Sequence, residues 1–157
     1  MSKTIEGILS GTGMKFAIIT TRWNDFITER LLNGARTACL RHGVDASSID
    51  EVIAPGAFEV PFIARKLAQT GKYDAVIALG CVIRGGTAHF DYVAGEAARG
   101  IASAMHDTGV PISFGILTVD TIEQAIERTG TKAGNKGEEA ALAAIETATL
   151  AKAIEEA

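Results

Sequence analysis

Cysteine and histidine are scarce in this sequence of 157 residues. There are two cysteines, Cys39 and Cys81, and three histidines. Neither cysteine belongs to a C-x-x-C pair, so the sequence predicts neither a disulfide framework nor a cysteine-based zinc site. The histidines are scattered and lack the clustering of a metal-binding triad. We therefore expect a protein without a bound metal, in a reducing compartment such as the cytoplasm.

Long hydrophobic runs and an excess of positive charge are also absent. No apolar stretch approaches the roughly 20 residues that a membrane-spanning helix needs. The first residues, MSKTIEGILSG, lack the apolar core of a signal peptide. The formal net charge is −4, whereas a protein that binds nucleic acid normally presents a basic surface. These absences argue against a membrane protein and against nucleic acid as a partner.

The apolar residues that are present follow two alternating patterns. Short continuous runs are typical of strands covered on both faces, and segments with three-to-four spacing are typical of helices. Glycine closes several of the helical segments, as at Gly43, Gly71 and Gly109. Strands are predicted at 14–21, 49–56, 73–83 and 111–119, and helices at 24–43, 58–71, 89–109, 121–130 and 137–155.

Strands that alternate with helices predict a parallel sheet with helices on both faces. We expect one domain over residues 1–157, because this length suits a single hydrophobic core. Residues 1–12 suit either an extra edge strand or an arm on a neighbouring molecule. Asn24 is expected to cap the first helix, and Asp120 with Glu123 to form a capping box at the fourth.

Four stretches at predicted strand ends suggest a pocket, because ligands of open α/β sheets bind beyond the carboxyl ends of the strands. They are Trp23-Asn24, PGAFE at 55–59, CVIRGGTAH at 81–89 and residues 118–121. Trp23 can either stack on a flat ring or pack as a hydrophobic staple on the following helix. Glu59 can face the pocket or simply stabilise the first turn of its helix. We expect a small-molecule site with an aromatic wall.

The loop RGGTAH at 84–89 suggests an anion site within this pocket. Gly85 and Gly86 allow close approach of the backbone, and Thr87 precedes a helix N-terminus, which favours a negative ligand. The same residues also suit a plain turn with a threonine cap. His89 is either a structural histidine or, because the helix dipole opposes its protonation, a neutral proton shuttle.

Three residues of the C-terminal part have ordinary structural explanations when taken alone. Arg128 fits the solvated face of a helix. Lys136 flanks a glycine-rich turn, GTKAGNKG at 130–137, and Phe114 near the start of a strand fits core packing.

Four blocks together resemble the lumazine synthase family: AIITTRWND, PGAFEVP, GCVIRGGTAHFDYV and FGILTVDTIEQAIERTGTKAGNKG. They cover nearly the whole chain in the right order. The resemblance implies a flavodoxin-like three-layer sandwich with a four-stranded parallel sheet. It implies a transferase that condenses 5-amino-6-ribitylaminouracil with 3,4-dihydroxy-2-butanone 4-phosphate in the penultimate step of riboflavin biosynthesis. The product is 6,7-dimethyl-8-ribityllumazine, phosphate and water are released, and no cofactor or metal is implied.

The resemblance also implies roles for individual residues. His89 is implied as the general acid/base, and Trp23 as the side chain that stacks on the pyrimidine ring. Ala57 stands where serine is frequent in the family, and Gly86 where alanine or serine is frequent. The other implied contacts are Ala57, Phe58 and Glu59 on the ribityl side, backbone groups of Cys81, Val82 and Ile83 at the pyrimidine, Gly86, Thr87, Arg128 and Lys136 at the phosphate, and Phe114 in the aromatic wall.

The position of Phe114 in the sequence indicates whether the site lies within one subunit or between two. Phe114 precedes the end of its strand by about four residues, which places it more than roughly 10 Å from the sheet edge where His89 is expected. A site that uses both residues must therefore lie between two subunits. This agrees with the family, whose homopentamers hold active sites at subunit interfaces and in some members form icosahedral shells. The short turn at 130–137 resembles that of the shell-forming members, and riboflavin synthase is a further implied partner.

Two other functions remain compatible with the sequence. The aromatic wall and the anion loop would also suit a module that binds or stores a flavin without turnover. A shell-forming scaffold with an inactive site is the second alternative, although His89, Arg128 and Thr87 are all present.

Overall fold

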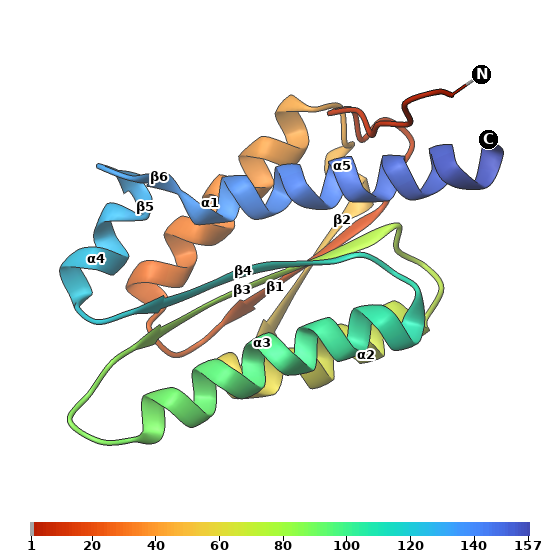
Figure 1. Cartoon of the computed structure of the whole chain (residues 1–157). Helices are drawn as coiled ribbons and strands as arrows, with labels where there is room; N and C mark the ends of the chain where they lie inside the picture. Colours follow the sequence, from red (N-terminus) through yellow and green to blue (C-terminus); the bar gives the residue numbers. More distant parts are fainter. Residues whose placement is uncertain (1) are drawn as a thin grey trace.

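A parallel sheet forms the centre of the protein (Figure 1). The structure is a computed structural model that describes residues 2–157. The strands have the order β2–β1–β3–β4, and all neighbours are parallel. Their bounds are β1 (Phe16–Thr21), β2 (Ile49–Ala54), β3 (Ala75–Ile83) and β4 (Ile112–Val119).

Two pairs of helices cover the sheet. Helices α1 (Asp25–Arg41) and α5 (Lys136–Glu156) pack on one face, and α2 (Val60–Gln69) and α3 (His89–Thr108) pack on the other (Figure 1). Every residue of β1 is buried, as expected for a central strand covered on both sides. The predicted flavodoxin-like three-layer sandwich is therefore confirmed. No helix within residues 2–157 combines the length and apolar character that a bilayer crossing requires.

Short elements complete the chain. Single 3₁₀ turns lie at Ala46–Ser48 and Ala57–Glu59, and helix α4 spans Ile122–Glu127. The glycine-rich turn after α4 contains a small antiparallel hairpin of β5 (Thr129–Thr131) and β6 (Gly134–Asn135).

Asn24 occupies the predicted N-cap position of α1, although its side chain does not cap the helix. Asn24 has a left-handed backbone with φ 61°, which asparagine tolerates better than most residues. Its side chain makes no capping hydrogen bond to α1. The amide Nδ2 instead donates to the carbonyl oxygen of Cys81 on β3, at 3.0 Å. Asn24 therefore joins the ends of two strands.

The capping box at α4 begins one residue later than predicted. Oγ1 of Thr121 accepts a hydrogen bond from the backbone N–H of Gln124, at 3.1 Å. Oε1 of Gln124 accepts from the backbone N–H of Asp120, at 2.8 Å. Threonine and glutamine thus take the places expected for Asp120 and Glu123, because the helix starts at Ile122.

The N-terminal segment is an arm and adds no strand to the sheet of this chain. Oγ1 of Thr149 on α5 accepts from the N–H of Ile8 at 2.9 Å and lies 3.0 Å from the Ile8 carbonyl oxygen. A side chain at Gly7 would overlap the backbone of Glu146, so glycine permits this close approach. Residues 2–12 therefore contact α5 and form no edge strand within this chain.

Stability is expected to fall in alkali. Burial raises the pKa of the Cys39 and Cys81 thiols to about 11, and a 2.6 Å hydrogen bond to Asp50 raises the pKa of Tyr73 to about 12. The unfolded chain loses these protons near pH 9 and 10, so it binds fewer protons than the folded chain above pH 9. The contribution of these three groups to the free energy of unfolding should be constant below about pH 9. It should decrease as the pH rises through about 11 and 12. Urea unfolding at pH 7.5, 9.5 and 11 tests this, and a constant free energy across these values would contradict it.

Candidate active site

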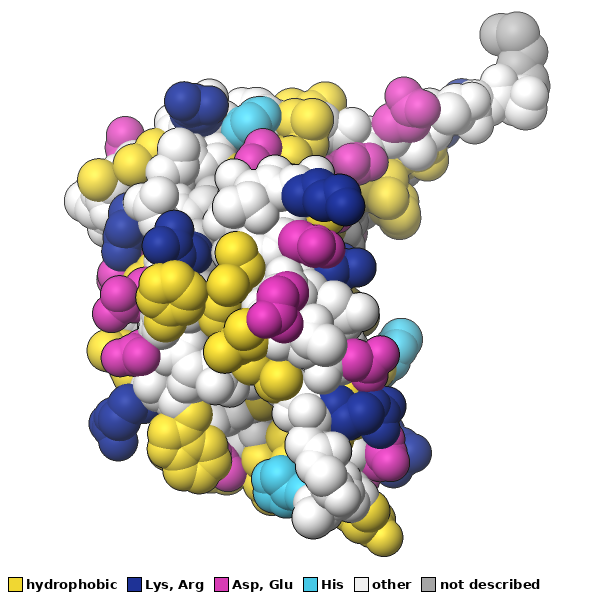
Figure 2. Space-filling model, turned by 90° about the vertical axis from the view of Figure 1, so that its left-hand side faces the viewer, with side chains coloured by type: hydrophobic (Ala, Val, Ile, Leu, Met, Phe, Trp, Pro, Cys, Tyr) yellow, Lys and Arg dark blue, Asp and Glu magenta, His cyan; other side chains and the backbone are white. Residues whose placement is uncertain are grey.

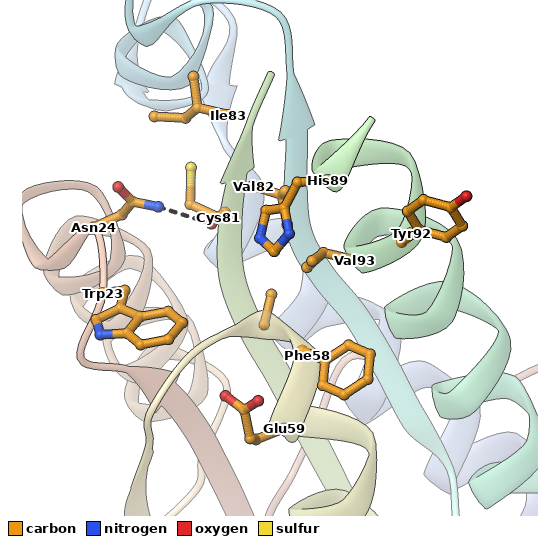
Figure 3. A pocket seen from close by; sticks show the side chains of 11 residues that line it. Trp23, Asn24, Phe58, Glu59, Cys81, Val82, Ile83, His89, Tyr92 and Val93 are labelled. Carbon is orange, nitrogen blue, oxygen red and sulfur yellow. Dashed lines mark hydrogen bonds between the residues drawn. The ribbon is translucent and has the colours of Figure 1, made fainter. Parts of the chain in front are cut away.

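The main cavity lies at the carboxyl ends of β1 and β3, where the order of the parallel strands reverses direction (Figure 3). Ligand sites of open α/β sheets form at such switch points. Its volume is about 460 Å³. The cavity brings together eight residues that the sequence predicts for the site: Trp23, Ala57, Phe58, Glu59, Cys81, Val82, Ile83 and His89.

Trp23 forms one wall of this cavity. Its backbone N–H donates to the carbonyl oxygen of Pro55 at 3.1 Å, and its carbonyl oxygen accepts from Oγ1 of Thr21 at 3.1 Å. A Cβ atom at Gly56 would lie 2.6 Å from Cε3 of the indole, so glycine makes room for the ring. The side chain is 65% exposed, which is more than a hydrophobic staple would leave open. The stacking alternative fits this position better.

Glu59 forms part of the opposite side. It lies in the 3₁₀ turn after β2, and Figure 3 shows its carboxylate directed toward the space between Trp23 and Phe58. Oε1 of Glu59 is buried and has no hydrogen-bond partner among the described residues. A buried carboxylate oxygen without a donor is unfavourable. Glu59 is therefore suited to accept a hydrogen bond from a ligand hydroxyl or N–H group.

Cys81, Val82 and Ile83 at the end of β3 also line the cavity. Burial raises the pKa of the Cys81 thiol to about 11, so this thiol stays protonated at neutral pH. A protonated thiol is a poor nucleophile, which leaves Cys81 a lining residue. The carbonyl oxygen of Cys81 accepts a hydrogen bond from the side-chain amide of Asn24. This bond fixes the end of β3 next to Trp23 (Figure 3).

His89 is the first residue of α3, and its ring points into the cavity (Figure 3). Its backbone N–H lies 3.4 Å from Oγ1 of Thr87, a long hydrogen bond. The loop that contains Gly86 and Thr87 joins Ile83 to His89 and is exposed, but it does not line the cavity. No atom lies within 4 Å of a Cβ built at Gly85 or Gly86, so the space beside this loop is open.

Three lining residues received no role in the site from the sequence analysis: Asn24, Tyr92 and Val93. Tyr92 and Val93 follow His89 by three and four residues on α3, which places them on the same helix face. That spacing was a usable signal. For Asn24 the only signal was its position next to Trp23, because its contact with Cys81 joins residues that are 57 positions apart in the sequence.

The remaining predicted residues lie in a different hollow. Phe114, Arg128 and Lys136 line a space of about 390 Å³ beside β4, and no residue lines both this space and the main cavity. Nη1 of Arg128 donates to the carbonyl oxygen of Gln124 at 3.0 Å and lies 3.7 Å from a carboxylate oxygen of Glu127. The N–H of Lys136 donates to the carbonyl oxygen of Arg128 at 2.8 Å. Apart from Gly86 and Thr87 on the exposed loop, the predicted site residues therefore form two separate groups in one chain.

The molecular face at the strand ends is mixed in character. Figure 2 views this side and shows hydrophobic side chains interspersed with side chains of both charges. Among the described residues, no group of three or more His, Cys, Asp or Glu side chains is arranged to hold a metal ion. The chemistry available at this face is aromatic stacking, hydrogen bonding and proton transfer.

A comparison with known families agrees with this arrangement. The family model described as 6,7-dimethyl-8-ribityllumazine synthase matches residues 13–152. The matched range includes both groups of site residues and begins directly after the N-terminal arm.

Proposed function

We propose that this chain, which belongs to the 6,7-dimethyl-8-ribityllumazine synthase family of transferases in riboflavin biosynthesis, condenses 5-amino-6-ribitylaminouracil with 3,4-dihydroxy-2-butanone 4-phosphate. The product is 6,7-dimethyl-8-ribityllumazine, and phosphate and water are released. The observation that carries the proposal is the single cavity at the strand ends that contains eight of the predicted site residues. Its size suits one substrate of this kind.

The pyrimidine substrate binds in the main cavity. Trp23 stacks on the ring, and backbone groups of Cys81, Val82 and Ile83 bind its polar edge. The unpaired Oε1 of Glu59 accepts a hydrogen bond from a ribityl hydroxyl. Ala57 and Phe58 line the same side, so the replacement of serine by alanine at position 57 costs at most one side-chain contact.

The reaction joins this pyrimidine to the sugar phosphate. The amine of the pyrimidine attacks the ketone, and loss of water gives a Schiff base. His89 then takes a proton from the carbon next to the new C=N bond, which lets the phosphate group leave. Backbone N–H groups at Gly86, the hydroxyl of Thr87 and the guanidinium of Arg128 stabilise the departing phosphate. The enol that remains rearranges to a ketone, and attack of the second amine on this ketone closes the ring with loss of a second water.

The complete site lies between two subunits. His89 faces one cavity of the chain, whereas Phe114, Arg128 and Lys136 line another. A single ligand can meet both groups when the main cavity of one subunit faces the β4 edge of the next. We propose a homopentamer as the smallest active unit, in the cytoplasm, with Phe114 completing the aromatic wall from the neighbouring subunit.

The size of the assembly is open to direct measurement. A shell of pentamers and an association with riboflavin synthase are the further assemblies that the family suggests. Light scattering of the native particle distinguishes a free pentamer from a shell by mass.

Incubation of the native protein with both substrates tests the proposed reaction. We expect fluorescent 6,7-dimethyl-8-ribityllumazine to form in parallel with inorganic phosphate, at a ratio of about one to one. Tight binding of riboflavin phosphate without product would favour a flavin-storage protein. Intact particles that form no product and bind no flavin would favour a scaffold.

A further inference from the structure

We propose that Arg84 is a positioning residue that braces the anion loop, defined as residues 85–88, and that it is not itself a ligand of the phosphate. This inference rests on the proposed function, because it concerns the same phosphate. An arginine directly before Gly85 and Gly86 would be an obvious candidate for phosphate binding. The contacts of its side chain assign it a different role.

Arg84 makes contacts at both ends of the anion loop. At the start of the loop, its backbone N–H donates to the carbonyl oxygen of Val119 at 2.8 Å. Beyond the end of the loop, its guanidinium lies 4.3 Å from the ring centre of Phe90, and Nη1 lies 3.5 Å from a carboxylate oxygen of Asp91. Arg84 therefore makes contacts at both ends of the loop: its backbone pairs with the last residue of β4, and its side chain contacts the first turn of α3.

Asp120 supplies the firmest contact of the brace. Nε of Arg84 donates to Oδ1 of Asp120 at 2.8 Å. This hydrogen bond is the main reason that the pKa of Arg84 is raised above its usual value. Two carboxylates, Asp91 and Asp120, thus face one guanidinium. The cluster carries no net positive charge that could attract a phosphate.

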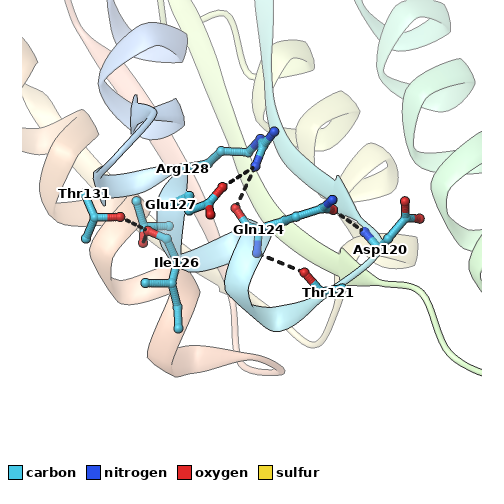
Figure 4. A network of polar contacts seen from close by, with 8 residues as sticks. Asp120, Thr121, Gln124, Ile126, Glu127, Arg128 and Thr131 are labelled. Atoms are coloured by element: carbon cyan, nitrogen blue, oxygen red, sulfur yellow. Dashed lines mark hydrogen bonds and ion pairs between the residues drawn. The ribbon is translucent and has the colours of Figure 1, made fainter.

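Helix α4 holds Asp120 in place (Figure 4). The backbone N–H of Asp120 donates to Oε1 of Gln124 at 2.8 Å, and the N–H of Gln124 donates to Oγ1 of Thr121 at 3.1 Å. The carbonyl oxygen of Gln124 accepts from Nη1 of Arg128 at 3.0 Å. The anion loop is therefore fixed against the same short helix that holds Arg128.

The brace matters because the anion loop has little packing of its own. Residues 84–88 are all exposed, and the space beside both glycines is empty of protein atoms. Backbone N–H groups bind an anion well only when their geometry is already set before binding. Loss of the brace should leave the donors present but less well oriented.

Asp120→Asn separates the two possible roles of Arg84. If Arg84 braces the loop, both Asp120→Asn and Arg84→Ala weaken binding of inorganic phosphate about three- to fivefold, an effect in the range of exposed ion pairs. The KM for the sugar phosphate rises by a similar factor, and the KM for the pyrimidine stays unchanged. If Arg84 instead binds phosphate, Asp120→Asn frees the guanidinium and leaves phosphate affinity unchanged or increased. That second result would overturn the proposal.

The controls address folding and charge. Glu96→Gln removes a carboxylate from α3 whose only ion pair among residues 2–157 is with Arg99, at 3.0 Å, and should leave phosphate affinity unchanged. Particle mass and circular dichroism verify that the variants fold, and Arg84→Lys replaces Arg84→Ala if Arg84→Ala does not fold.

The double variant Arg84→Ala/Asp120→Asn tests whether the two residues act through one contact. Its phosphate binding should be no weaker than that of the worse single variant, because each change breaks the same contact. Independent, additive losses would overturn the brace.

Calorimetric titration of the assembled native protein with inorganic phosphate keeps this test separate from the proposed reaction. Weaker phosphate binding in Asp120→Asn supports the brace even if the native protein forms no lumazine. Normal turnover with unchanged phosphate affinity and KM in Asp120→Asn overturns the brace alone. A native protein that neither binds phosphate nor turns over would overturn both proposals.

Discussion

Replacement of His89 by glutamine is expected to lower kcat by about 10²–10⁴, the range for loss of a general acid/base. Glutamine keeps a hydrogen-bonding side chain of similar reach but cannot exchange a proton near neutral pH. The ring of His89 points into the main cavity, next to the anion loop, so its proton transfer and phosphate departure occur side by side. Steady-state kinetics at saturating concentrations of both substrates measure the loss.

His106→Gln is the matched control for this variant. His106 lies on the same helix, in its last turn, and is exposed. It does not line the main cavity, so kcat should stay at the native value. A loss of less than about tenfold in His89→Gln would reduce His89 to a residue that only orients the substrate.

Replacement of Arg128 by alanine should lower kcat/KM for the sugar phosphate by about 10²-fold, because a charge-assisted hydrogen bond to phosphate is lost. The KM for the pyrimidine should change little, since Arg128 does not line the cavity that holds Trp23. Arg128→Lys should recover part of the loss, because it restores charge without the planar fork of donors. Initial rates with each substrate varied in turn measure this split.

Arg99→Ala controls for the loss of a positive charge. Arg99 is exposed on α3, and its only ion pair among the described residues is with Glu96. Its removal should leave both KM values unchanged. Equal changes in the two KM values of Arg128→Ala would argue against a specific phosphate contact.

The sheet and its helices were predictable because the sequence pattern and the packing agree. β3 is buried on both faces, so its sequence, AVIALGCVI, has no polar alternation. Gly109 ends α3 with a left-handed backbone, as its place after the last helical residue indicates. Local sequence patterns are enough to predict such elements, because the tertiary packing favours the same secondary structure as the local pattern.

Two differences from the predicted local structure arose where a distant contact overrides a local preference. Asn24 has the residue type of a cap, but its amide bonds to Cys81 on another strand. The place of the N-terminal arm depends on contact with Glu146 and Thr149, which lie nearly the whole chain away. No sequence window includes both partners of such contacts.

The residues of the main cavity could be predicted from the sequence better than the group beside β4. The general rule on strand ends identified the region of Trp23, Glu59 and His89, which the structure places in one cavity. Phe114 and Arg128 carried only structural explanations until the family resemblance was considered. Their chemistry depends on a neighbouring subunit, and a single sequence carries little information about which surfaces meet.

A mixed assembly of His89→Gln and Arg128→Ala subunits tests most directly whether the site is shared between neighbours. Equal amounts of the two chains are expressed together, so that they assemble at random. In a closed ring, a site is intact when one subunit supplies native His89 and the next supplies native Arg128, and this holds for about a quarter of sites. We predict that lumazine formation recovers to about a quarter of the native rate, far above either variant alone. A mixture that is only as active as the average of the two separate variants would show that each site belongs to one chain, and would contradict the shared site.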